Sequence, residues 1–499
     1  MSRRAAVIRA LLPLLALLAF SSCASLPPAA PAVPPAQESR VVIFHFNDVH
    51  GKIDGFPKVA ALIDAERRRG SDVLVFCAGD NFTGNPVIDQ YDPPGRPMLE
   101  LLNRLGVDLM TPGNHEFDVG MENLRLFAAQ ARFPFVSVNI RPRPGNEIPN
   151  LYASRLLTTK SGVRIAVFGL IQIEPGNGLP STHPDRVQGL RFSEPLATAL
   201  EMKPLRRNAD AFLALTHIGY EEDVKLAASM PELDAIIGGH SHTRVAPAET
   251  VNGVLVAQAG SDLRWLGRVE LLVRGGRVAA KKGELIDVKG LAAEDPEVKA
   301  MVARFNDNPA FARVIATAPF AIEGKDALGS MMTDAMRAVH GLDVAFQNEG
   351  GIRLRRLDPA ITLKDVYTLD PFGNQVVEIA MNAGEIRSLL RDSFEKGREL
   401  DLQVSGLSYT IRTDKELRIL GIDLRGLDGR PLAEDRDYKV GVSSYVASSY
   451  RFAHRDPGRS LNATTAEALI RYLQDGADLS LYRDIQRAFQ DPPGRNDRY

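Results

Sequence analysis

The sequence predicts an α/β protein of two domains, and three observations support this prediction. The chain has 499 residues, whereas a single hydrophobic core stops growing at about 250–300 residues. From Val41 onward, short apolar runs of strand length alternate with longer stretches that carry apolar residues at helical spacing. After Val41, no repeat and no low-complexity segment interrupts this alternation. Such an alternation is typical of α/β folds.

The expected elements follow in chain order. In the first domain, strands are expected at residues 41–46, 73–76, 107–110, 165–170, 211–215 and 235–237, and helices at 58–69 and 98–105. A charged helical stretch at 295–306 is expected to connect the domains. The second domain is marked by helices at 330–340 and 383–394 and by strands at 344–347 and 438–443. We therefore expect one domain at 41–290, a helical linker at 291–310 and a smaller domain at 311–499.

The N-terminus has the pattern of a bacterial export signal. A basic start precedes an apolar run from Leu11 to Phe20, which is about half of the ~20 residues that a membrane span needs. Two serines then precede Cys23, and this ending resembles the lipobox of bacterial lipoproteins, although Phe20 stands where leucine is usual. We expect a lipoprotein signal peptide at 1–22, acylation of Cys23 and a Pro/Ala-rich tether at 23–40. The protein would then be exported and lipid-anchored in the cell envelope; the alternative is a plain secretory signal.

Charge is close to balance, with 60 Lys and Arg against 62 Asp and Glu. Proteins that wrap a nucleic-acid backbone carry a basic surplus, so the composition argues against a nucleic-acid polymer as partner. Any nucleotide bound here is expected to be a small ligand. No feature of the sequence implies an obligate protein partner.

Metal-ligand residue types follow five of the predicted strands. The segments are Asn47-Asp48-Val49-His50, Gly79-Asp80-Asn81, Gly113-Asn114-His115-Glu116, Thr216-His217 and Gly239-His240-Ser241-His242. They contain five of the nine histidines in the chain. Each segment alone is typical of turns, but sites in α/β sheets form beyond the carboxyl ends of strands, so the repeated placement predicts one shared site.

The ligand types indicate which ions the site would hold. Imidazoles and carboxylates without thiolate fit zinc, manganese, iron or cobalt and argue against a structural zinc site. Seven candidates are too many for one tetrahedral ion and suit two divalent ions about 3.5–4 Å apart that share a carboxylate. The seven are Asp48, His50, Asp80, Asn114, His217, His240 and His242.

These segments occur in the order found in the calcineurin-like metallophosphoesterases, and the chain resembles the 5′-nucleotidases among them. The resemblance implies a double β-sandwich flanked by helices, followed by a smaller α/β domain of the 5′-nucleotidase type. It implies that one metal is held by Asp48, His50, Asp80 and His242, and the other by Asp80, Asn114, His217 and His240. It also implies that His115 faces the substrate phosphate and that Asp118 orients its ring.

The second domain is expected to bind the substrate. Arg353 closes the segment Asn348-Glu349-Gly350-Gly351-Ile352-Arg353, in which paired glycines allow a close approach of backbone and the guanidinium can grip a phosphate. The resemblance implies that Arg353 contacts phosphate beside Asn348 and Gly351, and that Phe372 and Tyr445 sandwich a nucleobase. The alternative is that both aromatics belong to the core.

Two departures from the family pattern concern this domain. Gly324-Lys325-Asp326-Ala327-Leu328-Gly329-Ser330 stands where an arginine and an acidic residue precede Asn-x-Gly-Asn, and Ser448-Ser449-Tyr450-Arg451 stands in place of Gly-Gly-Asp-Gly. One phosphate-side arginine and one ribose-side aspartate are therefore missing. Lys325 and Arg451 are candidates to replace them.

The sequence thus predicts a metal-dependent hydrolase of phosphomonoesters, with nucleoside 5′-phosphates as the foremost substrates, acting outside the cytoplasmic membrane. The alternatives are a cyclic-nucleotide or nucleotide-sugar phosphodiesterase, a sulfur-ester hydrolase of the same superfamily, and a surface-binding lipoprotein without turnover. A positioned histidine beside two metals argues against the last alternative, because binding alone does not need an acid.

Overall fold

The computed structural model describes residues 38–174 and 177–492. The expected signal peptide, Cys23 and the tether up to residue 37 lie outside the described residues. Among the residues described, no helix is long and apolar enough to cross a membrane.

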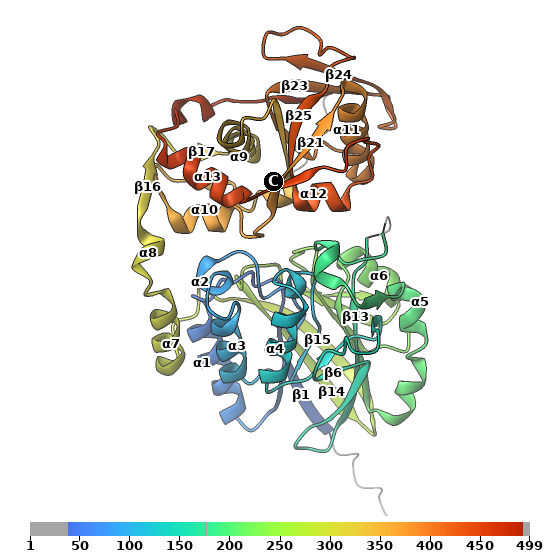
Figure 1. Ribbon diagram of the computed structural model, residues 1–499. Coiled ribbons are helices and arrows are strands. Elements are labelled where there is room, and N and C mark those ends of the chain that lie inside the picture. The colour runs from blue at the N-terminus through green and yellow to red at the C-terminus, as the bar shows by residue number, and fades with distance from the viewer. Residues whose placement is uncertain (1–37, 175–176, 493–499) are drawn as a thin grey trace, which may run out of the picture. The chain divides into compact units, whose positions relative to one another are not determined.

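The first half of the chain is built on two packed β-sheets (Figure 1). One sheet has the order β15-β14-β1-β2-β3-β4-β6 and the other the order β12-β13-β11-β10-β8-β7. The first contains β1 (Glu38–Phe46), β2 (Asp72–Cys77), β3 (Leu109–Met110), β4 (Phe135–Val136), β6 (Leu151–Tyr152), β14 (Trp265–Arg274) and β15 (Arg277–Asp287). The second contains β7 (Ser154–Thr158), β8 (Arg164–Ile171), β10 (Ala211–His217), β11 (Ala235–Gly238), β12 (Glu249–Val251) and β13 (Val254–Gln258).

The side chains of β1 point alternately to the two faces of the first sheet, and both faces are packed. Val41 and Ile43 pack into the core between the two sheets, whereas Val42, Phe44 and Phe46 pack into the core on the other face of the first sheet. Successive side chains of a strand point to opposite faces, so an apolar run of this kind is buried on both sides. The expected double sandwich flanked by helices is confirmed.

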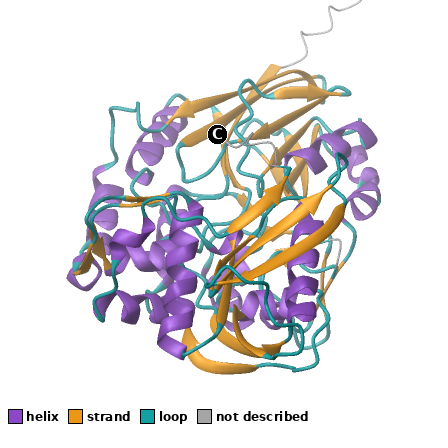
Figure 2. Cartoon of the chain, turned by 90° about the horizontal axis from the view of Figure 1, so that it is seen from above, coloured by secondary structure: helices purple, strands orange, loops and turns teal. Residues whose placement is uncertain are grey.

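Helices cover the outer faces of both sheets, and Figure 2 shows strands running between groups of helices. The first sheet is covered by α1 (Phe56–Arg68), α3 (Arg96–Leu105), α4 (Met121–Gln130) and α7 (Pro296–Asn306). The second is covered by α5 (Pro195–Leu200) and α6 (Tyr220–Ser229). The short α2 (Pro86–Asp89) follows β2.

Several boundaries differ from the sequence prediction by a few residues; for example, α9 (Lys325–His340) begins at Lys325 rather than at residue 330. The first strand begins at Glu38 rather than at Val41, because residues 38–40 pair with residues 272–274 of β14 and Arg40 forms an ion pair with Glu270. The strand expected at 107–110 is shortened to Leu109–Met110.

The second half of the chain has its own sheets and cores. A five-stranded sheet has the order β22-β18-β25-β21-β26, and a three-stranded sheet has the order β24-β23-β27. These strands are β18 (Val344–Asn348), β21 (Gln375–Met381), β22 (Leu402–Ser405), β23 (Leu407–Thr413), β24 (Ile419–Gly426), β25 (Tyr438–Ser443), β26 (Arg459–Thr464) and β27 (Ala488–Asp491). The helices are α8 (Pro309–Ala312), α9 (Lys325–His340), α10 (Leu363–Leu369), α11 (Ala383–Gly397), α12 (Ser444–Ser449) and α13 (Thr465–Gln474), with α11 and α12 in one core and α9, α10 and α13 in another.

Candidate active site

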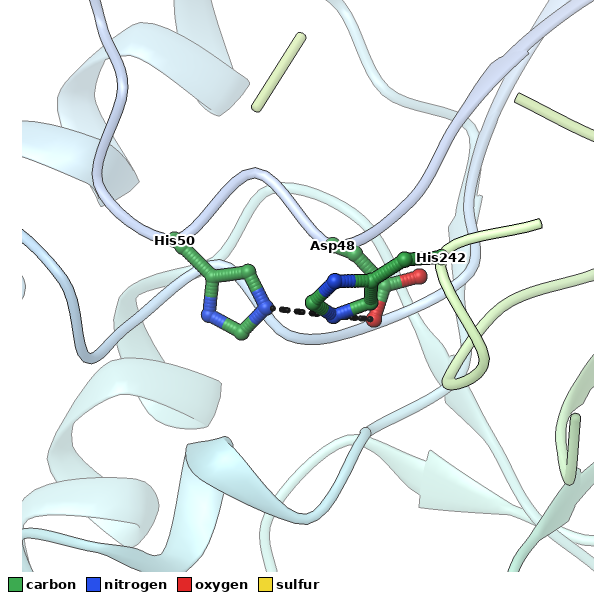
Figure 3. A group of neighbouring side chains, drawn as sticks. All are labelled: Asp48, His50 and His242. Carbon is green, nitrogen blue, oxygen red and sulfur yellow. Dashed lines mark hydrogen bonds and ion pairs between the residues drawn. The ribbon is translucent and has the colours of Figure 1, made fainter. Parts of the chain in front are cut away.

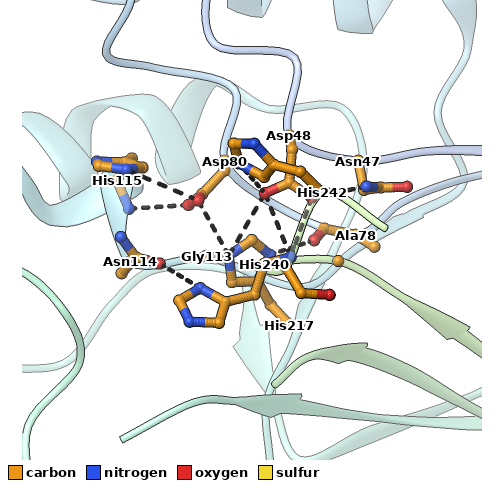
Figure 4. Close-up of polar contacts among 12 residues, drawn as sticks. Asn47, Asp48, Ala78, Asp80, Gly113, Asn114, His115, His217, His240 and His242 are labelled. Atoms are coloured by element: carbon orange, nitrogen blue, oxygen red, sulfur yellow. Dashed lines mark hydrogen bonds and ion pairs between the residues drawn. The ribbon is translucent and has the colours of Figure 1, made fainter. Parts of the chain in front are cut away.

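The structure brings the seven predicted ligand residues together at one end of the sandwich (Figures 3 and 4). They follow β1, β2 and β3 in the first sheet and end or follow β10 and β11 in the second. His217 is the last residue of β10 rather than a loop residue. Because these strands are parallel to their neighbours, their carboxyl ends meet at one edge.

Their side chains form overlapping groups of ligand atoms. Asp48, His50 and His242 form one group, and Asp80, His217 and His240 another, with the ligand atoms of each group within 4.8 Å of one another. In the first group, His50 Nε2 lies 3.0 Å from His242 Nε2, as Figure 3 shows. Asp80 also groups with His50 and His115, so this one carboxylate adjoins both sets.

The rings of two histidines are oriented as metal ligands require. Nδ1 of His217 lies 2.6 Å from the carbonyl oxygen of Ala78, and Nδ1 of His50 lies 3.0 Å from that of Thr83. A carbonyl can only accept, so Nδ1 carries the proton and Nε2 is left free to bind a cation. Asn114 belongs to the same cluster, since its Oδ1 lies 3.0 Å from His240 Nδ1.

The electrostatics of the cluster favour a cation. Burial alone would lower the pKa of His217, but the carboxylates of Asp80 and Asp48 raise it to about 10. Nε2 of His217 lies 3.0 Å from Oδ2 of Asp80. A negative potential strong enough to retain that proton also attracts a divalent metal ion, and metal binding releases such protons. The residues present therefore fit a metal centre.

The backbone of the cluster is strained. Asp48, His50, Asp80, His240 and His242 all have positive φ values, between 47° and 83°. This left-handed region costs non-glycine residues on the order of 1–3 kcal/mol and is retained mainly where function requires it. Five of the seven predicted ligands thus share a strained backbone conformation, an observation independent of the sequence pattern.

Glu116 holds two of the ligand-bearing loops together. Its carboxylate accepts hydrogen bonds from the backbone N–H groups of Asp80 at 2.9 Å, Asn81 at 2.8 Å and Gly113 at 2.6 Å. The side chain is fully buried. Sequence reasoning did not single out this role, because a glutamate after a ligand segment carries no signal of which amides it will meet.

His115 and Asp118 form a pair beside the cluster. Nδ1 of His115 lies 2.6 Å from Oδ2 of Asp118, and its Nε2 lies 3.9 Å from Oδ2 of Asp80. Burial alone would lower the pKa of His115, but the carboxylates of Asp118 and Asp80 raise it above its ordinary value. The two carboxylates therefore favour the protonated form of the ring, which can donate a proton.

A cavity of about 830 Å³ opens on the cluster and is lined by both halves of the chain. Its lining includes Asp80, Asn114, His115, His240 and His242 from the first half, and all five predicted substrate residues from the second. These five are Asn348, Gly351, Arg353, Phe372 and Tyr445. The volume is in the range of sites for small ligands.

Arg353 and Phe372 lie next to the predicted chemistry. Nη2 of Arg353 is 3.4 Å from Nε2 of His50, and the ring centroid of Phe372 is 5.7 Å from that of His115. Phe372 and Tyr445 are half-buried and line the cavity, so they are available to a ligand.

The candidates to replace the missing family residues do not reach the cavity. Among the described residues, neither Lys325 nor Arg451 lines it, and Nζ of Lys325 instead donates to the carbonyl of Glu349 at 2.9 Å. The second cationic side chain in the lining is Arg186, from the 3-10 turn Pro184–Val187 of the first half. Sequence analysis missed this turn because it carries no motif.

Fold and site together define the class: a double β-sandwich hydrolase with a carboxylate and imidazole centre at its strand ends, completed by a second α/β domain. A family model for the calcineurin-like phosphoesterases matches residues 41–244, and one for the 5′-nucleotidase C-terminal domain matches residues 310–451. The chain therefore belongs to the calcineurin-like metallophosphoesterases and carries the C-terminal domain of their 5′-nucleotidase branch.

Known proteins resemble the chain over most of its length. The trifunctional nucleotide phosphoesterase protein YfkN of Bacillus subtilis is 26% identical over 82% of this chain, which spans only 32% of that relative. The 5′-nucleotidase of Vibrio cholerae is 26% identical, with 89% of this chain and 92% of that protein covered. The crystal structure of a 5′-nucleotidase precursor from Thermus thermophilus superposes with a TM-score of 0.76 at 26% identity, covering 90% of this chain and 99% of that one.

Proposed function

We propose that the protein hydrolyses phosphomonoesters at two divalent metal ions, and that nucleoside 5′-phosphates are its main substrates. The observation that carries the proposal is that four residues of the cluster, the His115–Asp118 pair and Arg353 line one cavity; the four are Asp80, Asn114, His240 and His242. The relatives named 5′-nucleotidase, which match nearly the whole chain, support the substrate class.

The groups of side chains, together with the resemblance to the calcineurin-like metallophosphoesterases, support a ligand assignment. Asp48, His50, Asp80 and His242 would hold one ion, and Asp80, Asn114, His217 and His240 the other, with Asp80 shared. The donor set suits zinc, manganese, iron or cobalt. When bound, such ions lower the pKa of water and neutralise the oxygens of a phosphoryl group.

The other residues would bind the ester and assist departure of the leaving group. Arg353 would pair with phosphoryl oxygens through its guanidinium. His115, whose protonated form Asp118 favours, would donate the proton from Nε2 to the leaving oxygen or stabilise the charge that develops there. Phe372 and Tyr445 would hold the leaving group, with a flat nucleobase as the best fit to two rings.

A hydrolysis screen tests this proposal. The purified protein is assayed with nucleoside mono-, di- and triphosphates, cyclic nucleotides, nucleotide sugars, thiosulfate esters and p-nitrophenyl phosphate, with and without manganese. We expect the highest kcat/KM on nucleoside 5′-monophosphates. Turnover confined to cyclic nucleotides or nucleotide sugars would show that the protein is a phosphodiesterase. Turnover confined to sulfur esters would show that it is a sulfur-ester hydrolase. Tight binding without any turnover would show that it is a binding protein.

We also propose that the protein works outside the cytoplasmic membrane on a lipid anchor at Cys23. Support comes from the sequence before Glu38: a basic start, a short apolar run and a lipobox-like ending. Expressed from its full sequence, the wild type should sediment with membranes, and Cys23→Ser should be released. Retention of Cys23→Ser in the pellet would contradict the anchor.

A further inference from the structure

The carboxylate of Asp118 accepts hydrogen bonds from other side chains besides His115. Its Oδ2 accepts from His115 Nδ1 at 2.6 Å and also from the hydroxyl of Thr83 at 2.7 Å. Its Oδ1 accepts from the hydroxyl of Thr182 at 2.7 Å. Thr83 follows β2 and Thr182 follows β8, so segments from both sheets converge on one carboxylate. Both threonines are buried, with 3% and 4% of their surface exposed.

Thr83 adopts a backbone conformation that its side chain disfavours. Its φ is +63°, in the left-handed region, where a β-branched residue is a genuine outlier. The loop is kept in this conformation by Asp89, whose Oδ1 accepts from Thr83 N–H at 2.8 Å and whose Oδ2 accepts from Gly84 N–H and Asn85 N–H at 2.8 Å. Glycine or asparagine would adopt this φ at lower cost. A threonine here indicates that its hydroxyl is used.

Each threonine segment also touches a proposed metal ligand through its backbone. The carbonyl oxygen of Thr83 lies 3.0 Å from Nδ1 of His50, and the carbonyl oxygen of Ser181 accepts from Nδ2 of Asn114 at 3.0 Å. The backbone of each segment therefore orients a ligand, while the threonine hydroxyl orients the partner of His115. The metal cluster and the proton donor are thereby fixed relative to each other.

We propose that Thr83 and Thr182 are positioning residues that fix the Asp118 carboxylate, so that Nε2 of His115 points at the reacting ester. A carboxylate turns freely about its last torsion unless both oxygens are engaged. With three donors on Asp118, one orientation remains, and His115 keeps one tautomer and one ring position. The expected effect of these threonines on kcat rests on the proposed function, whereas their effect on the position of the His115 ring can be tested without turnover.

Matched substitutions separate the hydroxyl from the shape of the side chain. Thr83→Val and Thr182→Val keep the branched shape and lose the donor, whereas Thr83→Ser and Thr182→Ser keep the donor. Thr198→Val is the control, because Thr198 of α5 is 5% exposed and donates to the carbonyl of Glu194, just before this helix, at 2.6 Å. Each valine variant at the site should lower kcat by about 10–100-fold, the usual cost of losing a partner that orients a site residue. KM and calorimetric manganese affinity should stay unchanged, the serine variants should restore kcat, and Thr198→Val should match wild type.

The leaving group provides a readout that a packing role would not move. p-Nitrophenolate departs without a proton, whereas the 5′-oxygen of a nucleoside needs one. Thr83→Val should therefore slow AMP hydrolysis more than p-nitrophenyl phosphate hydrolysis. Equal losses on both esters, a parallel loss of manganese affinity, or serine variants as slow as the valine variants would overturn the inference.

A readout without turnover keeps the two proposals apart. In proton NMR spectra, the His115 Nδ1–H bonded to Asp118 should give a downfield resonance, assigned by its loss in His115→Ala. This resonance should shift or broaden in Thr83→Val and Thr182→Val and persist in the serine variants and in Thr198→Val. An inactive wild type with this pattern would contradict the proposed function alone. An unchanged resonance in folded valine variants would overturn the inference, whatever the activity.

Discussion

Four of the proposed metal ligands in the first half of the chain differ from the proposed substrate residues in the second half. Asp48, His50, Asp80 and His217 are at most 3% exposed, and three of them have left-handed backbones. Arg353, Phe372 and Tyr445 are half-buried, and none of them has a positive φ. Burial, and in three cases backbone strain, thus accompany these four ligands, while the groups proposed to bind the substrate have ordinary backbone conformations. Changes in the ligands should affect every substrate, and changes in the two aromatic side chains should depend on what the phosphate is attached to.

The largest effect is expected from Asp80→Asn. This change removes the carboxylate shared by both proposed ions but keeps the size of the side chain. We expect kcat to fall on every ester beyond about 10⁴-fold, the upper end for loss of a single general acid, together with loss of tight manganese binding in calorimetry. Asp210→Asn is the control, since Asp210 lies just before β10, at the opposite end from His217. Retained activity in Asp80→Asn would show that hydrolysis does not need a carboxylate shared by two metal ions at this position.

His115→Ala should have the next largest effect. Its proposed contact is with charge that develops only in the transition state, so kcat should fall on every substrate while KM changes little. The fall should be about 10²–10⁴-fold on nucleotides and smaller on p-nitrophenyl phosphate, whose leaving group departs without a proton. Manganese affinity should survive, because His115 is not one of the proposed ligands. A rise in KM with kcat preserved would instead place His115 in ground-state binding.

Phe372→Ala and Tyr445→Ala should separate recognition from chemistry. Each should raise KM for nucleotides while leaving p-nitrophenyl phosphate nearly unchanged, because a stacked base contributes binding energy remote from phosphorus. The loss of one stack should amount to about 1–3 kcal/mol. Equal effects on both substrates would show that the rings support the fold, and no effect on either would show that the substrate carries no nucleobase.

The smallest effect on activity is expected from Asp223→Asn. Burial raises the pKa of Asp223 to about 8, far above the value of about 3.9 in an unfolded chain. Between these two pKa values the folded state therefore holds a proton that the unfolded state releases. The stability that this proton contributes is fully present below about pH 4 and is lost as the pH rises to about 8. Asn mimics the neutral form, so the variant should gain stability relative to wild type over this range, by at most about 1.4 kcal/mol per pH unit. Parallel unfolding curves for the two proteins at pH 5 and pH 8 would contradict the assignment.

Much of the first half could be predicted from the sequence, because local patterns determine it. Runs such as 41–46 and 211–215 are apolar on both faces, and the ligand residues end or follow these strands directly. Position after a strand then implies position in space, since parallel strands end at one edge.

The contacts around the site could not be predicted in the same way. Thr83 and Thr182 meet at Asp118 from segments far apart in the chain, and neither belongs to a ligand motif. The placement of Arg186 in the cavity depends on the path of the loop after β8, for which no spacing rule exists. The sequence likewise carries no signal for side chains that bind backbone amides of the site, as Glu116 does.

The account depends most directly on the metal centre, which can be tested by removal and return of metal. The protein is treated with chelator until elemental analysis shows no transition metal, and AMP hydrolysis is then followed as manganese is added. The account predicts no turnover without metal and full recovery as two equivalents per chain are bound, with Asp80→Asn failing to recover. Undiminished hydrolysis by protein verified to be free of metal would contradict it.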